Sequence, residues 1–112
     1  GHTPDMREVT TRSPIIIESN NGVSNLRGTI AMARTSAPKS ATAHFYFNVK
    51  DNPRLDYRSD IKPGYCAFGK VVKGLDVLDS IRVVPTGEHG AYRDVPLEPI
   101  LIHSARVLSW SL

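Results

Sequence analysis

The stretch "TAHFYFNV", Thr42 to Val49, alternates its side chains in the manner of a β-strand. One face of that strand carries Phe45, Phe47 and Val49. The opposite face carries His44, Tyr46 and Asn48. We expect the first face to lie in the core. The second face is too polar for an ordinary core and too aromatic for an ordinary solvated surface.

Short strands separated by turns are predicted on both sides of this segment. The β-branched run "PIIIES" ends at the turn signal "NNG", and "GTIAMAR" alternates moderately. "YCAFGKVV" and the closing "PILIHSARVLSW" have the same character. The predicted strands are therefore 14–19, 28–34, 43–49, 65–72 and 99–110.

One short helix is predicted at 74–82, where Leu75, Leu78 and Ile81 recur at helical spacing. The segments 35–42, 50–64 and 85–96 are rich in polar residues, proline and glycine, and are predicted to be loops. A loop as long as 50–64 inside a compact domain is usually functional or mobile. Several strands, one helix and long loops predict a mainly β fold, a barrel or sandwich with a capping helix.

Length and composition predict one soluble domain, residues 1–112. The chain has 112 residues, of which 40% are hydrophobic and 22% charged, a balance typical of globular proteins and not of disordered tails. The net charge is +3, but the 14 lysines and arginines are scattered. We therefore expect an ordinary basic surface and no nucleic-acid partner. No apolar run is long enough to span a membrane, so no membrane partner is expected.

Standard catalytic and metal-binding motifs are missing from the sequence. The 4 histidines have no metal-ligand spacing, and no nucleophile elbow, P-loop or dinucleotide fingerprint occurs. The single cysteine, Cys66, lies among apolar residues in "GYCAFGKV", which favours a buried, inert thiol over a nucleophile. No metal and no cofactor are expected.

Two long segments carry a resemblance to a known family. "NNGVSNLRGTIAMARTSAPKSATAHFYFNVKDN", followed by "GYCAFGKVVKGLDVLDSI", resembles the cyclophilin-type peptidyl-prolyl cis/trans isomerases of bacteria. The segments "GTIAMAR", "SAT" and "FGKVVKG" are in the family's order and spacing, and the resemblance extends over residues 3–109. It implies a cyclophilin-like antiparallel β-barrel with a capping helix.

The resemblance also implies that part of the barrel precedes this chain. Family members carry two strands, a helix and an "FHR"-type segment with the catalytic arginine before the point that matches "TPDM". We therefore expect this chain to correspond to the C-terminal two thirds of a cyclophilin, with an incomplete barrel and little activity by itself. Open strand edges would then favour self-association or a complementing N-terminal segment.

By the same resemblance, several residues correspond to substrate-binding positions. Tyr46 and Leu55 match apolar walls of the proline pocket, and Tyr65 matches a position that is tyrosine in many bacterial members. Ala33, Arg34 and Thr35 match a strand end whose backbone pairs with the bound peptide. Each side chain of the pocket has an ordinary alternative: Tyr46 as a core residue, and Leu55 and Tyr65 as structural residues. The partners implied are proline-containing peptides and unfolded proteins.

Two positions depart from the family pattern. His44 replaces the usual glutamine that hydrogen-bonds the substrate, and its alternative is a surface or hydrogen-bonded strand histidine. Arg54 replaces an aromatic residue at the pocket rim and has the alternative of a solvated loop residue. Because that aromatic residue contributes to binding cyclosporin in the family, weak cyclosporin binding is expected.

The resemblance predicts a prolyl isomerase that assists protein folding. A non-catalytic proline-peptide-binding module using the same groove is the alternative, and a basic scaffold for acidic partners is a third hypothesis. The chain begins "GHTPDM", without an initiator methionine, which suggests a processed, trimmed or engineered start. The compartment stays open, although "FGKVVKGLDV" and "SARVL" are closer to exported members than to cytoplasmic ones.

Overall fold

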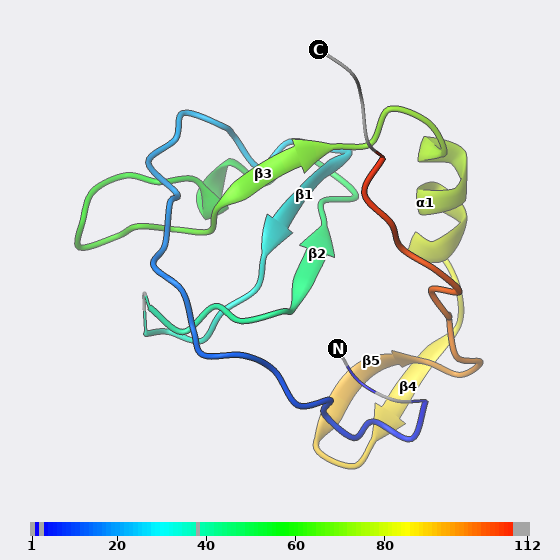
Figure 1. The fold of residues 1–112 in the computed structure, drawn as a ribbon. Helices are drawn as coiled ribbons and strands as arrows, with labels where there is room; N and C mark the ends of the chain where they lie inside the picture. The colour runs from blue at the N-terminus through cyan, green and yellow to red at the C-terminus, as the bar shows by residue number, and fades with distance from the viewer. Residues whose placement is uncertain (1, 3, 38, 109–112) are drawn as a thin grey trace. The chain divides into compact units, whose positions relative to one another are not determined.

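The strand β1, Thr29–Met32, is the middle of a three-stranded antiparallel sheet in the computed structural model, which describes residues 2, 4–37 and 39–108 (Figure 1). β2, Phe45–Phe47, and β3, Ala67–Lys70, flank it in the order β2-β1-β3. All three lie within strands predicted from sequence. The chain divides into two compact units, Gly1–Arg82 and Val83–Leu112, which are described separately.

The register of β1 and β2 confirms the alternation of side chains. Ala31 pairs with Tyr46, whereas Ile30 pairs with Phe47 and Met32 with Phe45. On the other side of β1, Ala31 pairs with Ala67 after a shift in register. One face of the sheet therefore carries Ala31, Tyr46 and Ala67, and the opposite face carries Ile30, Met32, Phe45 and Phe47.

The expected assignment of the faces to core and surface was wrong. Phe45 and Phe47, on the face expected to lie in the core, are 44% and 39% exposed, whereas Asn48, on the face described as too polar for an ordinary core, is 1% exposed. Asn48 is covered by the segment before β1 and by the long loop, because Gly28 and Asn52 both donate hydrogen bonds to it. The phenylalanine face retains its exposure because the described part of the unit holds one small sheet and one short α-helix, too little structure to cover both faces of the sheet.

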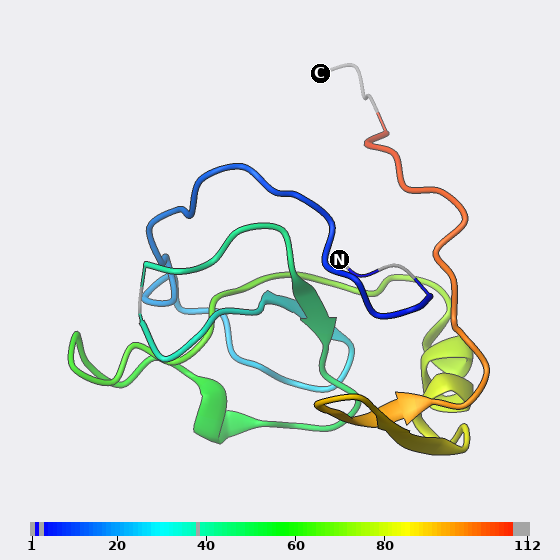
Figure 2. The same ribbon diagram turned by 90° about the horizontal axis from the view of Figure 1, so that it is seen from below.

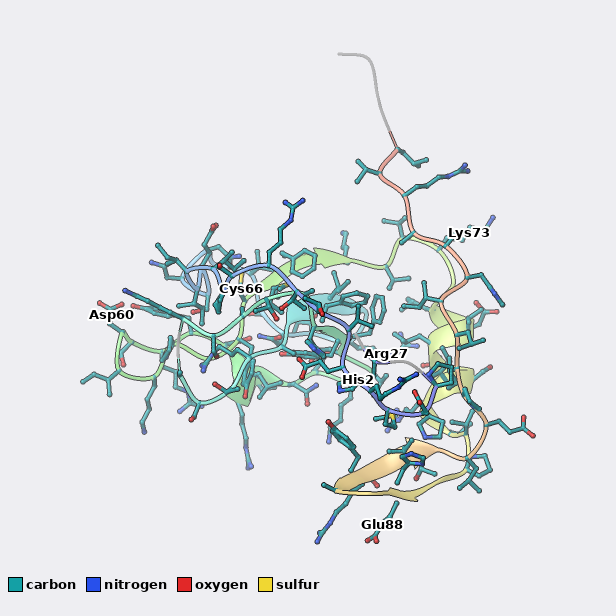
Figure 3. The ribbon with its side chains drawn as sticks, turned by 60° about the horizontal axis from the view of Figure 1, so that its bottom comes forward. His2, Arg27, Asp60, Cys66, Lys73 and Glu88 are labelled. Carbon is teal, nitrogen blue, oxygen red and sulfur yellow. The ribbon has the colours of Figure 1, made fainter. Side chains whose placement is uncertain are left out.

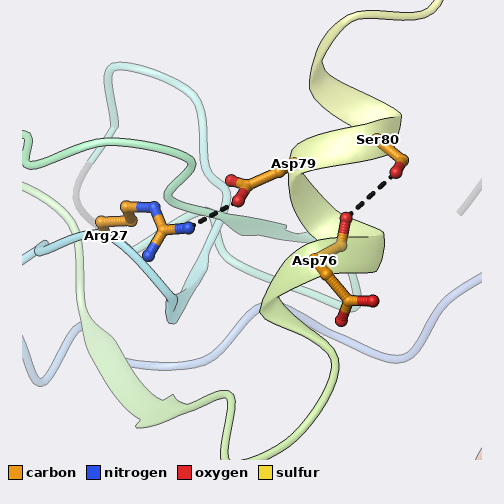
Figure 4. A network of polar contacts seen from close by, with 4 residues as sticks. All are labelled: Arg27, Asp76, Asp79 and Ser80. Carbon is orange, nitrogen blue, oxygen red and sulfur yellow. Dashed lines mark hydrogen bonds and ion pairs between the residues drawn. The ribbon is translucent and has the colours of Figure 1, made fainter.

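The helix α1, Leu75–Arg82, confirms the prediction for 74–82. Leu78 is its buried residue, as expected for the apolar stripe of an amphipathic helix. Arg27, just before β1, extends to the helix and forms an ion pair of 2.7 Å with Asp79 (Figure 4). The hydroxyl of Ser80 donates to the Asp76 carbonyl one turn earlier. The ion pair joins the helix to the segment that enters the sheet.

The long loop 50–64 is held by local structure. It contains one 3-10 turn, η1, Pro53–Leu55, and extends to a tip at Asp60 (Figure 3). Gly64 closes the loop at a φ of 65°, and a Cβ there would lie 2.6 Å from the Asp56 carbonyl oxygen. Glycine is therefore required where the loop returns toward β3.

The strand predicted at 14–19 is not formed as an element. Ile15 makes only an isolated antiparallel bridge with Ala41, and its N–H donates to the Ala41 carbonyl at 2.8 Å. β-branched residues favour an extended chain, but a strand also needs a continuous partner. Residue Ala41 lies in an irregular connection that offers only one pairing position.

The second unit corrects two further predictions. Residues 85–96 were expected to be loop but form an antiparallel hairpin, β4, Thr86–His89, and β5, Tyr92–Pro96. Gly90 turns the chain at a φ of 60°, a conformation that glycine adopts without strain. The glycines and charged residues of this segment indicated a loop, but they belong to a short hairpin whose strands are mostly exposed.

The closing strand predicted at 99–110 is also wrong for the residues that the structure describes. Residues 99–108 contain no strand (Figure 2), and Ile100, Leu101 and Ile102 are exposed. Residues 109 and 110 lie outside the described residues. An apolar run such as Ile100 to Ile102 favours an extended backbone, but a strand exists only where a second strand exchanges hydrogen bonds with it.

The described structure is mainly β, with antiparallel sheets and one α-helix, and its barrel is not closed. Among the described residues, no helix has both the length and the apolar character needed to cross a membrane.

Candidate functional site

Asn25 lies at the centre of a buried hydrogen-bond network. Asn25 is 0% exposed, and within the described part of the chain Asn25 and Asn48 are the largest fully buried side chains. The side-chain nitrogen donates to the carbonyl oxygens of Leu55 at 3.2 Å and Tyr65 at 3.1 Å. The side-chain oxygen accepts from the Tyr46 hydroxyl and from the Asn48 amide, both at 3.1 Å. The network thus joins a strand, the 3-10 turn and the entry to β3.

Asp56 fixes Asn25 from the loop side. One carboxylate oxygen accepts the Asn25 backbone N–H at 2.6 Å and the side-chain amide at 3.0 Å. Burial raises the pKa of Asp56, but the hydrogen bonds from Asn25 and Ser24 and the charge of Arg58 together outweigh this effect and hold the pKa below its usual value. The carboxylate form of Asp56 is therefore the form that the fold favours.

The two tyrosines of this cluster pack edge to face. The rings of Tyr46 and Tyr65 lie 6.0 Å apart at an interplanar angle of 83°, an arrangement favoured by their quadrupoles. The Arg34 guanidinium lies 4.8 Å from the centre of the Tyr65 ring and donates to the Gly64 carbonyl. Burial, followed by the nearby Tyr65 and Asp56, raises the pKa of Tyr46 to about 12. Tyr46 is thus a neutral hydrogen-bond donor at ordinary pH.

A second group of residues surrounds the C-terminal end of β1. Ala33, Arg34, Thr35 and His44 line a hollow of about 260 Å³ together with Glu8. The Ala33 N–H donates to the His44 carbonyl at 2.9 Å, and the Thr35 N–H donates to the Ser40 hydroxyl at 3.0 Å. His44 Nε2 lies 3.1 Å from Glu8 Oε1. A peptide bound here would use backbone groups other than these two N–H donors.

Cys66 borders a different, apolar hollow of about 240 Å³, with Ile15, Met32 and Phe68 among its lining residues. The thiol is half-buried, and burial raises its pKa, which disfavours the reactive thiolate. Figure 3 shows Cys66 near the base of the long loop. Among the described residues, no three histidine, cysteine or acidic side chains gather in a way that could hold a metal ion.

Comparison with known proteins identifies the family. Residues 2–107 match the family described as cyclophilin type peptidyl-prolyl cis-trans isomerase/CLD. The chain belongs to this family. It is 49% identical over 109 residues to peptidyl-prolyl cis-trans isomerase B of Escherichia coli K12, covering 96% of this chain and 66% of that protein.

Two other bacterial relatives are similar to the same extent. The chain is 47% identical over 110 residues to peptidyl-prolyl cis-trans isomerase cyp18 of Streptomyces antibioticus, covering 96% of this chain and 66% of the relative. It is 48% identical over 109 residues to a peptidyl-prolyl cis-trans isomerase of Acinetobacter baylyi, covering 97% of this chain and 57% of the relative. The chain therefore spans two thirds or less of the length of these cyclophilins.

Within this cyclophilin chain, the residues predicted to bind substrate form two neighbouring groups. Tyr46, Leu55 and Tyr65 share the Asn25 network. The other four, Ala33, Arg34, Thr35 and His44, line the hollow with Glu8. Arg34 belongs to both, because it stacks on Tyr65 and lines the hollow. Arg54 is exposed and borders another hollow with Asp56 and Arg58, as expected for a solvated loop residue.

Sequence analysis missed Asn25, Asp56 and Glu8. Asn25 lies three residues after the turn signal "NNG". It was not singled out as a site residue, because asparagine near a turn is usually exposed. Only the folded loop brings three acceptors and two donors around its side chain. Glu8 precedes the predicted strands and carried no signal of its own, since its partner His44 lies 36 positions away.

Proposed function

We propose that the protein containing this chain is a peptidyl-prolyl cis/trans isomerase that assists folding by rotating X-Pro bonds without a cofactor or covalent step. The observation that carries the proposal is the match of residues 2–107 to the cyclophilin family. In this proposal residues 1–112 form part of a single cyclophilin-like domain. The activity and the substrates of the whole protein are proposals, because the chain spans two thirds or less of the length of its relatives.

The proposed chemistry requires a pocket and a polar frame. Rotation of the peptide bond crosses a barrier of about 18–20 kcal/mol, and a catalyst must bind the twisted amide better than either planar form. Tyr46, Leu55 and Tyr65 would hold the proline ring. Arg34 and its neighbours would hold the peptide backbone, with His44 as a hydrogen-bonding partner.

The pocket residues alone supply little stabilisation of the twisted nitrogen. In the family resemblance this task belongs to an arginine in an "FHR"-type segment, and no segment of this chain matches it. We therefore propose that these residues bind proline peptides but rotate the bond slowly until such a guanidinium is supplied. The Arg34 guanidinium is committed to Tyr65 and to backbone carbonyls, so it does not take this role.

The exposed apolar face supports a polypeptide partner. Phe45, Phe47 and Phe68 are 44%, 39% and 53% exposed, and β2 and β3 are both edges of the sheet. The relatives have a further third or more of sequence that this chain does not match. We propose that a segment corresponding to that additional sequence covers the phenylalanine face, and a second copy of this chain is the competing occupant.

Two-dimensional exchange NMR on an Ala-Pro tetrapeptide tests the proposed activity. The chain by itself should broaden the peptide resonances by binding and should leave cis/trans exchange slow. The same protein extended by the "FHR"-type segment should accelerate exchange at catalytic concentration. An extended protein that binds the peptide without accelerating exchange would contradict the proposal and favour a binding module.

Cyclosporin provides a second test of the pocket rim. The exposed Arg54 offers no aromatic surface to an apolar cyclic peptide, so weak binding is expected. Isothermal titration of the extended protein measures it, and a submicromolar dissociation constant would contradict the assignment of Arg54 to the rim.

A further inference from the structure

Among the residues that the structure describes, the two largest fully buried side chains are both asparagines, Asn25 and Asn48. Burial of an amide is costly unless its hydrogen bonds are made. We propose that Asn25 is the positioning residue of the proline pocket, setting the arrangement of Tyr46, Leu55 and Tyr65 although it touches no substrate itself. This inference rests on the proposed function of the pocket.

The side chain of Asn25 uses its full hydrogen-bonding capacity. A carboxamide offers two N–H donors and an oxygen that accepts two hydrogen bonds. The oxygen accepts from Tyr46 and Asn48. The nitrogen lies within hydrogen-bond distance of the Leu55 and Tyr65 carbonyls and the Asp56 carboxylate.

This environment fixes the orientation of the amide. Reversing it would place the Asn25 oxygen against two carbonyls and a carboxylate, and would place its nitrogen against the Asn48 amide donor. The backbone N–H of Asn25 also donates to Asp56, so the carboxylate holds both the main chain and the side chain. Asn25 therefore has one orientation available, with its oxygen toward Tyr46.

The contacts of Asn25 act on the pocket from three directions. The Tyr46 ring is anchored at its hydroxyl, at the end far from the strand. The carbonyls of Leu55 and Tyr65 are held by one nitrogen, and the Tyr65 N–H also donates to the Leu55 carbonyl at 2.8 Å. One buried side chain therefore anchors the Tyr46 hydroxyl and the Tyr65 backbone, and the Arg34 guanidinium over the Tyr65 ring completes the support of the edge-to-face contact.

Asn48 provides a matched control. It is 1% exposed and also lies in the network. Its side-chain nitrogen donates to Asn25 and to the Thr29 hydroxyl, and its oxygen accepts from Asn52. None of these partners is a predicted pocket residue, so Asn48→Ala removes a buried amide of equal size without releasing a pocket wall directly.

The experiment compares Asn25→Ala, Asn48→Ala and Tyr46→Phe in the full chain. Two quantities are measured at a temperature where circular dichroism shows each variant to be folded. One is the nuclear Overhauser effect, without peptide, between the Tyr65 ring and the aromatic ring at position 46. The other is the dissociation constant for an Ala-Pro tetrapeptide from NMR titration.

Asn25→Ala should lose the contact between the rings and weaken peptide binding about tenfold, because the hydrogen bonds that hold the pocket walls in their binding arrangement are lost. Asn48→Ala should retain the contact and weaken binding clearly less than Asn25→Ala does, because the bonds of Asn25 to Tyr46, Leu55, Tyr65 and Asp56 remain. Equal effects of both alanine variants on ring contact and affinity would show that Asn25 is merely structural and would overturn the inference.

The remaining outcomes are also decisive. If Asn25→Ala does not fold, Tyr46→Phe tests the anchored hydroxyl alone, and unchanged ring contact and affinity in that variant would overturn the inference. If the unmodified chain binds no peptide, the proposed function fails, but the ring contact without peptide still decides whether Asn25 positions the two rings.

Discussion

Replacing the exposed phenylalanines of β2 should weaken self-association of this chain, because it removes the apolar surface that we expect to be buried between two copies. Phe45 and Phe47 pack edge to face, with ring centres 5.9 Å apart, on a strand that forms an edge of the sheet. At a full exposure of roughly 200 Å² for a phenylalanine, their exposed fractions of 44% and 39% leave roughly 160 Å² of surface accessible. Covering this area is worth at most about 4 kcal/mol, or about a thousandfold in an association constant.

The perturbation is Phe45→Thr together with Phe47→Thr, since threonine favours strands and carries a hydroxyl. Sedimentation equilibrium over a concentration series should show the original chain self-associating in the absence of a covering segment. The double variant should require at least about tenfold higher concentration to associate, allowing for incomplete coverage of the rings.

Ile61→Thr is the matched control, because Ile61 is 91% exposed but lies in the long loop, away from the sheet face. It should leave association nearly unchanged. Equal suppression of association by the control and by the double variant would refute the assignment of association to the phenylalanine face and would indicate general surface stickiness.

Three further predictions follow from the polar contacts. The fold lowers the pKa of Asp56. The contribution of Asp56 to stability should therefore be complete above the ordinary carboxyl pKa of about 4 and be lost as pH falls through the lowered pKa. Urea midpoints measured against pH should show this loss, and Asp56→Asn should make the loss smaller. The pKa of Tyr46 is raised to about 12, so the neutral phenol stabilises the fold below the ordinary value of about 10, and this contribution is lost as pH rises toward 12; ultraviolet titration should detect late-ionising phenol absorbance that decreases in Tyr46→Phe, whereas the hydrogen bond to Asp60 raises the pKa of Tyr57 in both proteins. The half-exposed ion pair between Arg27 and Asp79 should be worth about 0.5 kcal/mol in a double-mutant cycle with Arg27→Gln and Asp79→Asn, and a coupling above about 2 kcal/mol would be inconsistent with its exposure.

Short-range sequence patterns predicted the elements that depend mainly on neighbouring residues in the sequence. The helix 74–82 was predicted from the spacing of its apolar residues, with aspartates on the opposite side, and the strands that contain β1 and β3 were predicted from short segments of residues that favour strands. The hairpin at 86–96 was missed because its charged residues and glycines are typical of loops. The strand expected at 99–110 was wrong for the described residues, because an apolar segment gives no information on whether a pairing partner is present.

The candidate site was predictable only in part. The family resemblance led to Tyr46, Leu55 and Tyr65, which the structure places on one network. The burial of Asn48 and Asn25 was not predictable, because hydropathy favours phenylalanine over asparagine for the interior. Their burial follows from complete hydrogen bonding, a property of the folded loop and not of any short stretch of sequence.

The Asn25 network also constrains the order of folding. Its partners Tyr46 and Tyr65 lie 21 and 40 positions further along the chain, so closing it requires two successive loops to be ordered, at an entropic cost that local contacts do not offset. The network should therefore close late and in one step. Amide protons at Asn25 and Tyr65, both bonded within it, should then exchange with solvent through a single shared opening, which makes the pocket the unit of local unfolding.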